Sequence, residues 1–169
     1  MLTESLILFL HPPKTAGTSI ENAILHKKDI FPNKHNCFAG LEKHSTYQSY
    51  LNVLDDKPKI TFMSIRNPYE RHFSYFKSHI NGKRIKYNPK MTMYDRFNDY
   101  MCNLYQKVCD EKIAPLKVEE NIYLEYCSGD YSILDYVIVF ENIDEDWRQF
   151  QNFIKNSESN ISIPNLDHL

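Results

Sequence analysis

Glycine is scarce in this chain. Only 4 of its 169 residues are glycine, whereas the usual share of ~7% predicts about 12. The glycines stand at positions 17, 40, 82 and 129, so no two lie within twenty residues of each other. That spacing excludes the G-x-G-x-x-G dinucleotide fingerprint and the G-x-x-x-x-G-K-S/T phosphate loop. If this protein binds a phosphate group, it must do so with another kind of loop.

Long apolar runs and a strong net charge are absent as well. The run at residues 6–10 has five apolar residues, and a membrane-spanning helix needs about 20. The first four residues lack the basic start of a secretory signal peptide, so we expect a cytoplasmic protein without a membrane partner. The net charge of −2 favours no nucleic-acid partner, and a polyanionic ligand would need a local basic site.

The cysteine pattern argues against disulfides and against a metal centre. The chain has four cysteines, none in a C-x-x-C motif: Cys37, Cys102, Cys109 and Cys127. Without a secretory signal, we expect free thiols. On a helix, Cys102 and Cys109 would share a face, which suggests packing. His35, Cys37 and His44 could be read as zinc ligands, but no fourth ligand is nearby, so no metal is predicted.

Hydrophobic periodicity predicts strands that alternate with helices. Strands are expected at residues 6–10, 59–65 and 136–140. Helices are expected at residues 19–28, 47–54, 67–80, 91–108, 119–125 and 144–154. This alternation predicts an α/β fold, a three-layer domain with a central parallel sheet flanked by helices. The length favours one domain over residues 1–169, with 155–169 a flexible tail or a truncated C-terminus.

The first loop that could carry chemistry joins the first strand to the first helix. It reads His-Pro-Pro-Lys-Thr-Ala-Gly-Thr-Ser over residues 11–19. A helix N-terminus offers backbone N–H groups and the positive end of a dipole, and Lys14 adds a mobile charge. Thr15, Thr18 and Ser19 add hydroxyl donors, and Gly17 lets the backbone approach an anion closely. The alternative is an ordinary helix cap by Thr18 or Ser19 beside a solvated lysine.

The second such segment follows a later strand. Arg66 comes directly after it, and the planar guanidinium suits an oxyanion. Asn67, Pro68 and Glu70 form a compact helix start, and Arg71 and Ser74 lie one turn apart on that helix. The alternative is a solvated Arg66 and a surface ion pair for Arg71. Together the two segments suggest a ligand with two separate anionic groups, bound where the strands end.

Together the two segments resemble the sulfotransferases that use 3′-phosphoadenosine 5′-phosphosulfate (PAPS), most of all the carbohydrate branch and its small bacterial relatives. Residues 11–19 match that branch's 5′-phosphosulfate loop, H-x-P-K-T-A-G-T-S. Residues 66–76 match its 3′-phosphate motif, R-N/D-P-x-x-R-x-x-S-x-Y, except that Phe76 stands where Tyr is usual. Residues 139–143 are similar to its R-x-E-N-L segment, with Val139 in place of the arginine.

This resemblance implies a P-loop-like fold and a set of donor-binding residues. Lys14, Thr15, Ala16, Gly17, Thr18 and Ser19 would hold the 5′-phosphosulfate. Arg66 and Ser74 would hold the 3′-phosphate, the group that distinguishes PAPS from ATP. Lys14 would neutralise the bridging oxygen as it leaves, and the family needs no metal. The product would be 3′-phosphoadenosine 5′-phosphate (PAP).

The resemblance also implies a general base for the acceptor hydroxyl. Some relatives, of the uronyl 2-O-sulfotransferase type, take it from a His-x-Ser/Thr-aromatic segment, which residues 44–47 match through His44. Other branches use a glutamate, which makes Glu42 the competing candidate. A histidine at this place could also be a helix cap or a surface residue.

The function expected from the resemblance is transfer of a sulfuryl group from PAPS to a hydroxyl, here of a carbohydrate acceptor. A basic loop at residues 83–90 could bind an anionic sugar or be a solvated charge run. The alternative function is a non-catalytic relative that binds PAP or PAPS, suggested by a C-terminus shorter than is usual in the family. A kinase-like enzyme is a weaker alternative, because no acidic metal-binding motif supports it. The sequence predicts no particular oligomeric state.

Overall fold

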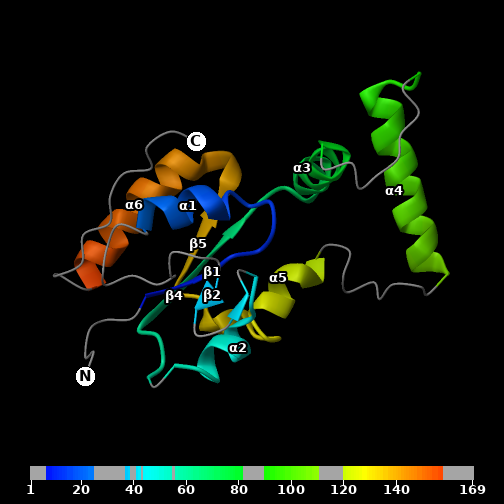
Figure 1. Ribbon diagram of the computed structural model, residues 1–169. Coiled ribbons are helices and arrows are strands. Elements are labelled where there is room, and N and C mark those ends of the chain that lie inside the picture. The colour runs from blue at the N-terminus through cyan, green and yellow to red at the C-terminus, as the bar shows by residue number, and fades with distance from the viewer. Residues whose placement is uncertain are drawn as a thin grey trace. The chain divides into compact units, whose positions relative to one another are not determined.

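A computed structural model describes residues 7–24, 37–38, 41–42, 44–54, 56–81, 90–110 and 120–157 (Figure 1). The chain divides into two compact units. The first unit is made of residues 1–66 and 123–169, and the second of residues 67–122.

The first unit contains a parallel sheet of three strands. Its order is β1 (Ile7–Leu10), β4 (Ile60–Ile65), β5 (Tyr136–Val139). In the register, Leu10 is opposite Met63, and Ile65 is opposite Val139. Because the strands are parallel, the residues that follow them emerge at one edge of the sheet. The predicted α/β fold with a parallel sheet is thus confirmed.

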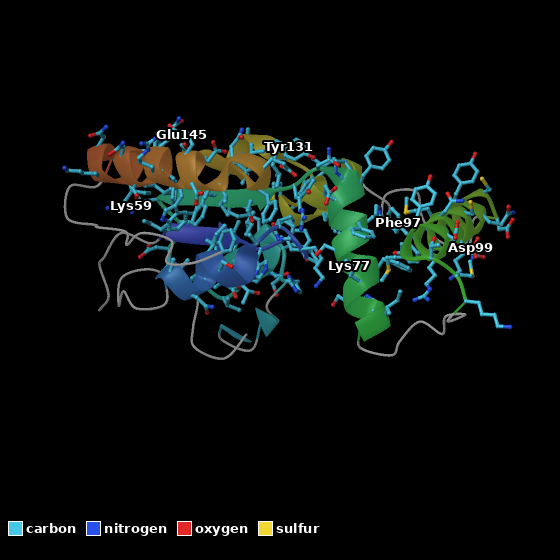
Figure 2. The ribbon with its side chains drawn as sticks, turned by 90° about the horizontal axis from the view of Figure 1, so that it is seen from above. Lys59, Lys77, Phe97, Asp99, Tyr131 and Glu145 are labelled. Carbon is cyan, nitrogen blue, oxygen red and sulfur yellow. The ribbon has the colours of Figure 1, made fainter. Side chains whose placement is uncertain are left out.

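Helices cover both faces of this sheet. Figure 1 shows α1 (Gly17–Ile24) and α6 (Ile143–Ser157) along one face. On the other side lie α2 (Tyr47–Leu51) and residues 123–126 of α5 (Glu120–Tyr126). The core under α1 and α6 is a cluster of buried apolar side chains: Ile7, Phe9, Ile20, Ile24, Ile60, Phe62, Ile138, Ile143, Trp147, Phe150 and Ile154. Figure 2 shows Glu145 on the side of α6 that faces away from the sheet.

The second unit contains two helices, α3 (Pro68–Asn81) and α4 (Met93–Cys109). The predicted Asn67 cap is present, since its Oδ1 accepts from the N–H of Tyr69 at 3.0 Å. The helices pack through aromatic rings, with Phe97 of α4 at centroid distances of 5.1 Å from Phe73 and 5.5 Å from Phe76. Figure 2 shows Phe97 on the side of α4 that faces α3.

Several local expectations differ from the structure. Helical spacing places Tyr69 in line with Phe73 and Phe76, and Tyr94 in line with Phe97, which predicts that both tyrosines pack. In the structure they are 73% and 77% exposed. The aromatic packing covers the middle of each helix, and a tyrosine beyond it keeps its hydroxyl in water. Cys102 and Cys109 are both exposed, so the prediction that they pack in the core is wrong.

Other differences concern element boundaries. Helix α1 begins at Gly17 rather than at Ser19, and α6 continues to Ser157. A short antiparallel pair, β2 (Cys37–Phe38) and β3 (Leu41–Glu42), was not expected, because two-residue strands leave no periodic pattern. Single 3₁₀ turns at Tyr131–Ile133 and Phe140–Asn142 flank β5. In the ranges described, each helix is too short or too polar to cross a lipid bilayer.

The second unit also contains a titratable group that links stability to pH. His72 is buried, and desolvation, with a smaller effect of the charge on Arg71, lowers the pKa of His72 to about 4. In the unfolded chain its pKa is about 6.5, so between these values the unfolded state binds more protons. The stability that neutral His72 contributes is therefore present above pH 6.5 and is lost as the pH falls towards 4.

We expect His72→Gln to remove this part of the acid sensitivity, because glutamine does not titrate. Urea denaturation of both proteins at pH 7.0 and at pH 4.5 measures the effect. The free energy of unfolding should fall less in the variant than in the original chain over this interval. An equal fall in both proteins would show that His72 does not titrate with a lowered pKa.

Candidate active site

The loop after β1 has an unusual backbone. Lys14 and Ala16 have φ angles of 68° and 65°, in the left-handed region that residues with a Cβ rarely adopt. Each costs about 1–2 kcal/mol of backbone strain. Strain of this kind persists where the surrounding structure imposes it, and it concentrates at ligand sites. Alternating right- and left-handed residues also turn successive N–H groups into one concavity, which suits an anion.

The N-terminus of α1 completes this loop. The carbonyl of Ala16 accepts from the N–H groups of Ser19 at 2.9 Å and Ile20 at 3.1 Å, so the helix begins directly after Ala16. Thr18 and Ser19 lie inside the first turn rather than at the cap. The alternative in which one of them is an ordinary helix cap therefore does not describe this loop. The positive end of the helix dipole lies beside Lys14 and Ala16 instead.

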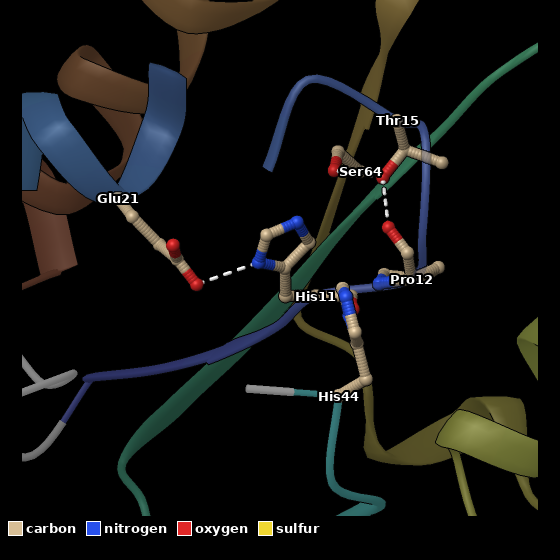
Figure 3. Close-up of polar contacts among 6 residues, drawn as sticks. All are labelled: His11, Pro12, Thr15, Glu21, His44 and Ser64. Carbon is tan, nitrogen blue, oxygen red and sulfur yellow. Dashed lines mark hydrogen bonds and ion pairs between the residues drawn. The ribbon is translucent and has the colours of Figure 1, made fainter. Parts of the chain in front are cut away.

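Thr15 anchors the loop to the sheet. Its side chain is fully buried, and its hydroxyl donates to the carbonyl of Pro12 at 2.8 Å. Because that uses its only proton, the Ser64 hydroxyl, at 2.9 Å, donates to Thr15 in turn (Figure 3). Ser64 belongs to β4, next to β1 in the sheet. The Thr15 hydroxyl is thus engaged inside the protein.

Gly17 is required by a close contact rather than by its own backbone angles. A Cβ at this position would lie 1.9 Å from Cδ2 and 2.0 Å from Nε2 of His11. His11 is only 4% exposed, and its Nδ1 hydrogen-bonds Oε1 of Glu21 at 2.5 Å. The ring therefore has little room to move away. Glycine is needed at position 17 because it lets the loop approach His11, and the sequence alone does not reveal this requirement.

His44 lies next to this loop. Its Nδ1 is 2.7 Å from the carbonyl oxygen of His11 (Figure 3). A carbonyl oxygen only accepts, so Nδ1 carries the proton and Nε2 of the neutral ring carries the lone pair. The cap of α2 is Thr46, whose side chain accepts from the N–H of Ser49, so His44 is not a helix cap. His44 is thus an exposed histidine whose Nδ1–H is engaged by the main chain, which leaves Nε2 as the ring nitrogen that can accept a proton or a hydrogen bond.

The competing base and the hypothetical metal ligands fall largely outside the described residues. Glu42 lies in β3, opposite Cys37, but the description does not extend to its side chain. His35 and the side chain of Cys37 also lie outside it. Among the side chains that are described, no group of three or more His, Cys, Asp or Glu could hold a metal ion.

Arg66 lies at the same edge of the sheet as the loop, after the neighbouring strand. The hydroxyl of Tyr123 donates to its carbonyl and accepts from its N–H, both at 3.1 Å. Its guanidinium carbon lies 4.1 Å from the centroid of the Phe140 ring, a cation–π contact. The sequence did not predict the contacts of Tyr123 and Phe140 with Arg66. For Phe140, one sequence feature could have indicated the contact: it follows β5 directly, as Arg66 follows β4.

The remaining residues of the second motif lie in the second unit. Arg71 and Ser74 are on α3, three residues apart and therefore one turn apart on the helix. The Arg71 side chain is buried, with 4% of its surface exposed, so it does not lie at the surface as the alternative of a surface ion pair requires. Ser74 is half-buried.

Two substitutions at adjacent positions test this description of the loop. Gly17→Ala should lower the free energy of unfolding by about 1–3 kcal/mol, because its Cβ displaces a buried ring. Ala16→Gly should change it by less than about 1 kcal/mol, since relief of strain offsets the greater freedom of glycine in the unfolded chain. Urea denaturation of the two variants measures both values. A Gly17→Ala protein as stable as the original would contradict the close approach of His11.

Comparisons with known proteins agree with this fold. A family model described as the sulfotransferase family matches residues 1–165. The crystal structure of a sulfotransferase from Alicyclobacillus acidocaldarius aligns with 13% sequence identity and a TM-score of 0.54. The alignment covers 100% of this chain and 87% of that one, and at this identity it concerns the fold alone. No curated protein sequence matches significantly. Since the family model spans nearly the whole chain, this protein belongs to the sulfotransferase family.

Proposed function

We propose that this protein transfers a sulfuryl group from PAPS to a hydroxyl of a carbohydrate acceptor. Family membership supports sulfuryl transfer in general. The strained loop after β1 carries the proposal for the donor, because Lys14 and Ala16 adopt left-handed angles at the N-terminus of α1. A loop of this shape with one lysine fits a phosphosulfate group.

The donor site that we propose uses each residue of this loop in a definite way. Thr15, Ala16 and Gly17 contribute backbone N–H groups, and Thr18 and Ser19 contribute the first turn of α1. Lys14 contributes a positive charge that would stabilise the oxygen from which the sulfuryl group departs. The Thr15 hydroxyl keeps its structural contacts to Pro12 and Ser64 throughout.

Arg66 and Ser74 are the proposed ligands of the 3′-phosphate. The backbone of Arg66 is held by Tyr123 and its guanidinium lies over Phe140, which limits the number of positions that the side chain can take. An arginine held in this way loses less conformational entropy on binding a phosphate.

His44 is the proposed general base. Its Nδ1–H donates to the His11 carbonyl, so its Nε2 can take the proton of the acceptor hydroxyl. PAPS, when bound, supplies the sulfuryl group. The chain itself positions the groups and stabilises the developing charge, the main demands of such a transfer. We propose that these residues act without a metal ion.

One observation favours a second candidate function, a relative that binds PAP or PAPS without turnover. Val139 stands where the family's R-x-E-N-L segment has its arginine, so one cation of that pattern is missing here. Incubation of the full chain with radiolabelled PAPS and a panel of glycans distinguishes the two functions. Transfer to any glycan supports the enzyme, and tight PAP binding with no transfer supports the second candidate. Preference for ATP with Mg²⁺ over PAPS would contradict both.

Two substitutions separate catalysis from donor binding. Lys14→Ala should lower kcat by about 10²–10³-fold, the usual loss when one group that stabilises the transition-state charge is removed. Arg66→Ala should weaken PAP binding by about 10- to 100-fold in calorimetry, because a charge-assisted hydrogen bond contributes about 1.5–3 kcal/mol. Lys155→Ala and Arg148→Ala remove exposed cations from α6 and serve as controls. An unchanged PAP affinity in Arg66→Ala would refute its assignment.

The identity of the base requires a separate comparison. His44→Ala should lower kcat by about 10²–10⁴-fold, the usual contribution of a well-placed base, with PAP affinity unchanged. Glu42→Gln should retain most of the activity if His44 is the base. The reverse result, an active His44→Ala and an inactive Glu42→Gln, would assign the role to Glu42.

A further inference from the structure

The side chains packed against the loop after β1 include Glu21, a residue outside both sequence motifs. Glu21 is in the second turn of α1, on the buried face of the helix that also contains Gly17, Ile20 and Ile24. It is 9% exposed. Burying a carboxylate among apolar side chains costs free energy unless it is hydrogen-bonded, so this region of the fold depends on the hydrogen-bond partner of Glu21.

That partner is the imidazole of His11, which is held from several directions. Its Nδ1 hydrogen-bonds Oε1 of Glu21 at 2.5 Å (Figure 3). Its ring also stacks on Phe9 at a centroid distance of 5.6 Å. The edge of the ring formed by Cδ2 and Nε2 lies against Gly17. With the ring held in this way, the backbone of residue 11 has a defined position at the end of β1.

The backbone of residue 11 in turn holds His44. The His11 carbonyl accepts from Nδ1 of His44 at 2.7 Å. The two rings also meet edge to face, with centroids 4.7 Å apart and an interplanar angle of 74°. His44 therefore contacts both the main chain and the side chain of His11. A displacement of His11 would remove the acceptor that selects the His44 tautomer.

Glu21 also acts on the helix that follows His44. Tyr50 of α2 is buried, and burial together with the negative charge of Glu21 raises the pKa of Tyr50 to about 12. Tyr50 thus stays protonated near neutral pH. Glu21 therefore lies near the end of β1, where His11 contacts His44, and also near α2, the helix that follows His44 in the chain.

We infer that Glu21 is a positioning residue for the proposed reaction: by holding the His11 imidazole, it keeps His44 in the tautomer whose Nε2 can accept a proton. The part of this inference that concerns the reaction rests on the proposed function. The part that concerns the His44 tautomer can be measured in the absence of PAPS and of a sulfuryl acceptor. Glu21 acts through His11 and touches no reacting atom.

The test uses the full chain labelled with ¹⁵N in histidine, and the His44 signals are assigned with a His44→Gln variant. In the original chain, neutral His44 should carry its proton on Nδ1. Glu21→Leu should shift His44 towards the tautomer that histidine favours in water, with the proton on Nε2. Glu21→Gln, whose amide oxygen can still accept from His11, should restore the original tautomer. Ile24→Ala, a buried change on the same helix outside this network, should leave the tautomer unchanged.

The effects of the Glu21 variants on kcat should parallel their effects on the His44 tautomer. Glu21→Leu should lower kcat by about tenfold, part of the 10²–10⁴-fold that a well-placed base supplies, and Glu21→Gln should recover most of it. An Nε2–H tautomer of His44 in the original chain would overturn the inference even if Glu21→Leu did not fold. An unchanged tautomer in a folded Glu21→Leu protein would also overturn it. The predicted tautomers in a chain that transfers no sulfuryl group would support the inference and contradict the proposed function.

Discussion

The hydrogen bond between His11 and Glu21 constrains the backbone path of the loop after β1, because it fixes the imidazole against which the start of α1 packs. Both side chains are buried, so each satisfies a polar group that would otherwise be costly to remove from water. Loss of one partner from a buried pair typically costs about 3–5 kcal/mol. With the imidazole in this position, the start of α1 can approach only if residue 17 lacks a Cβ. The left-handed angles of Lys14 and Ala16 lie on either side of Thr15, whose buried hydroxyl is bonded to Pro12 and Ser64.

The parallel sheet brings this loop and Arg66 to the same edge. Leu10 is opposite Met63, so the loop begins beside Ser64, which contacts Thr15. Ile65 is opposite Val139, so Arg66 emerges beside Phe140, over whose ring its guanidinium lies. Segments far apart in the sequence thus meet, because adjacent parallel strands end together. This is the general position of ligand sites in open α/β sheets.

The groups proposed for catalysis sit on loops, and the elements behind them are well packed. The core beneath α1 and α6 contains close aromatic contacts such as Phe62 with Phe150, at a centroid distance of 4.3 Å. Asp146 of α6 accepts from the N–H of Val139 at 2.7 Å and so ties the end of β5 to this helix. A scaffold of this kind allows His44 and Arg66 to be positioned by short contacts without being part of the core.

The local elements and the two motifs can be predicted from the sequence alone. The three strands, the Asn67 cap and the buried stripe of Trp147, Phe150 and Ile154 follow from patterns within a few residues, and the structure confirms them. The roles of the individual site residues stay predictions. The burial of Glu21 against His11 and the contacts of Arg66 with Tyr123 and Phe140 arise only when the chain folds. The tertiary structure likewise determines that Tyr69 is exposed. Periodicity and caps act between neighbours in the chain, whereas these contacts depend on which strands pair and in which register.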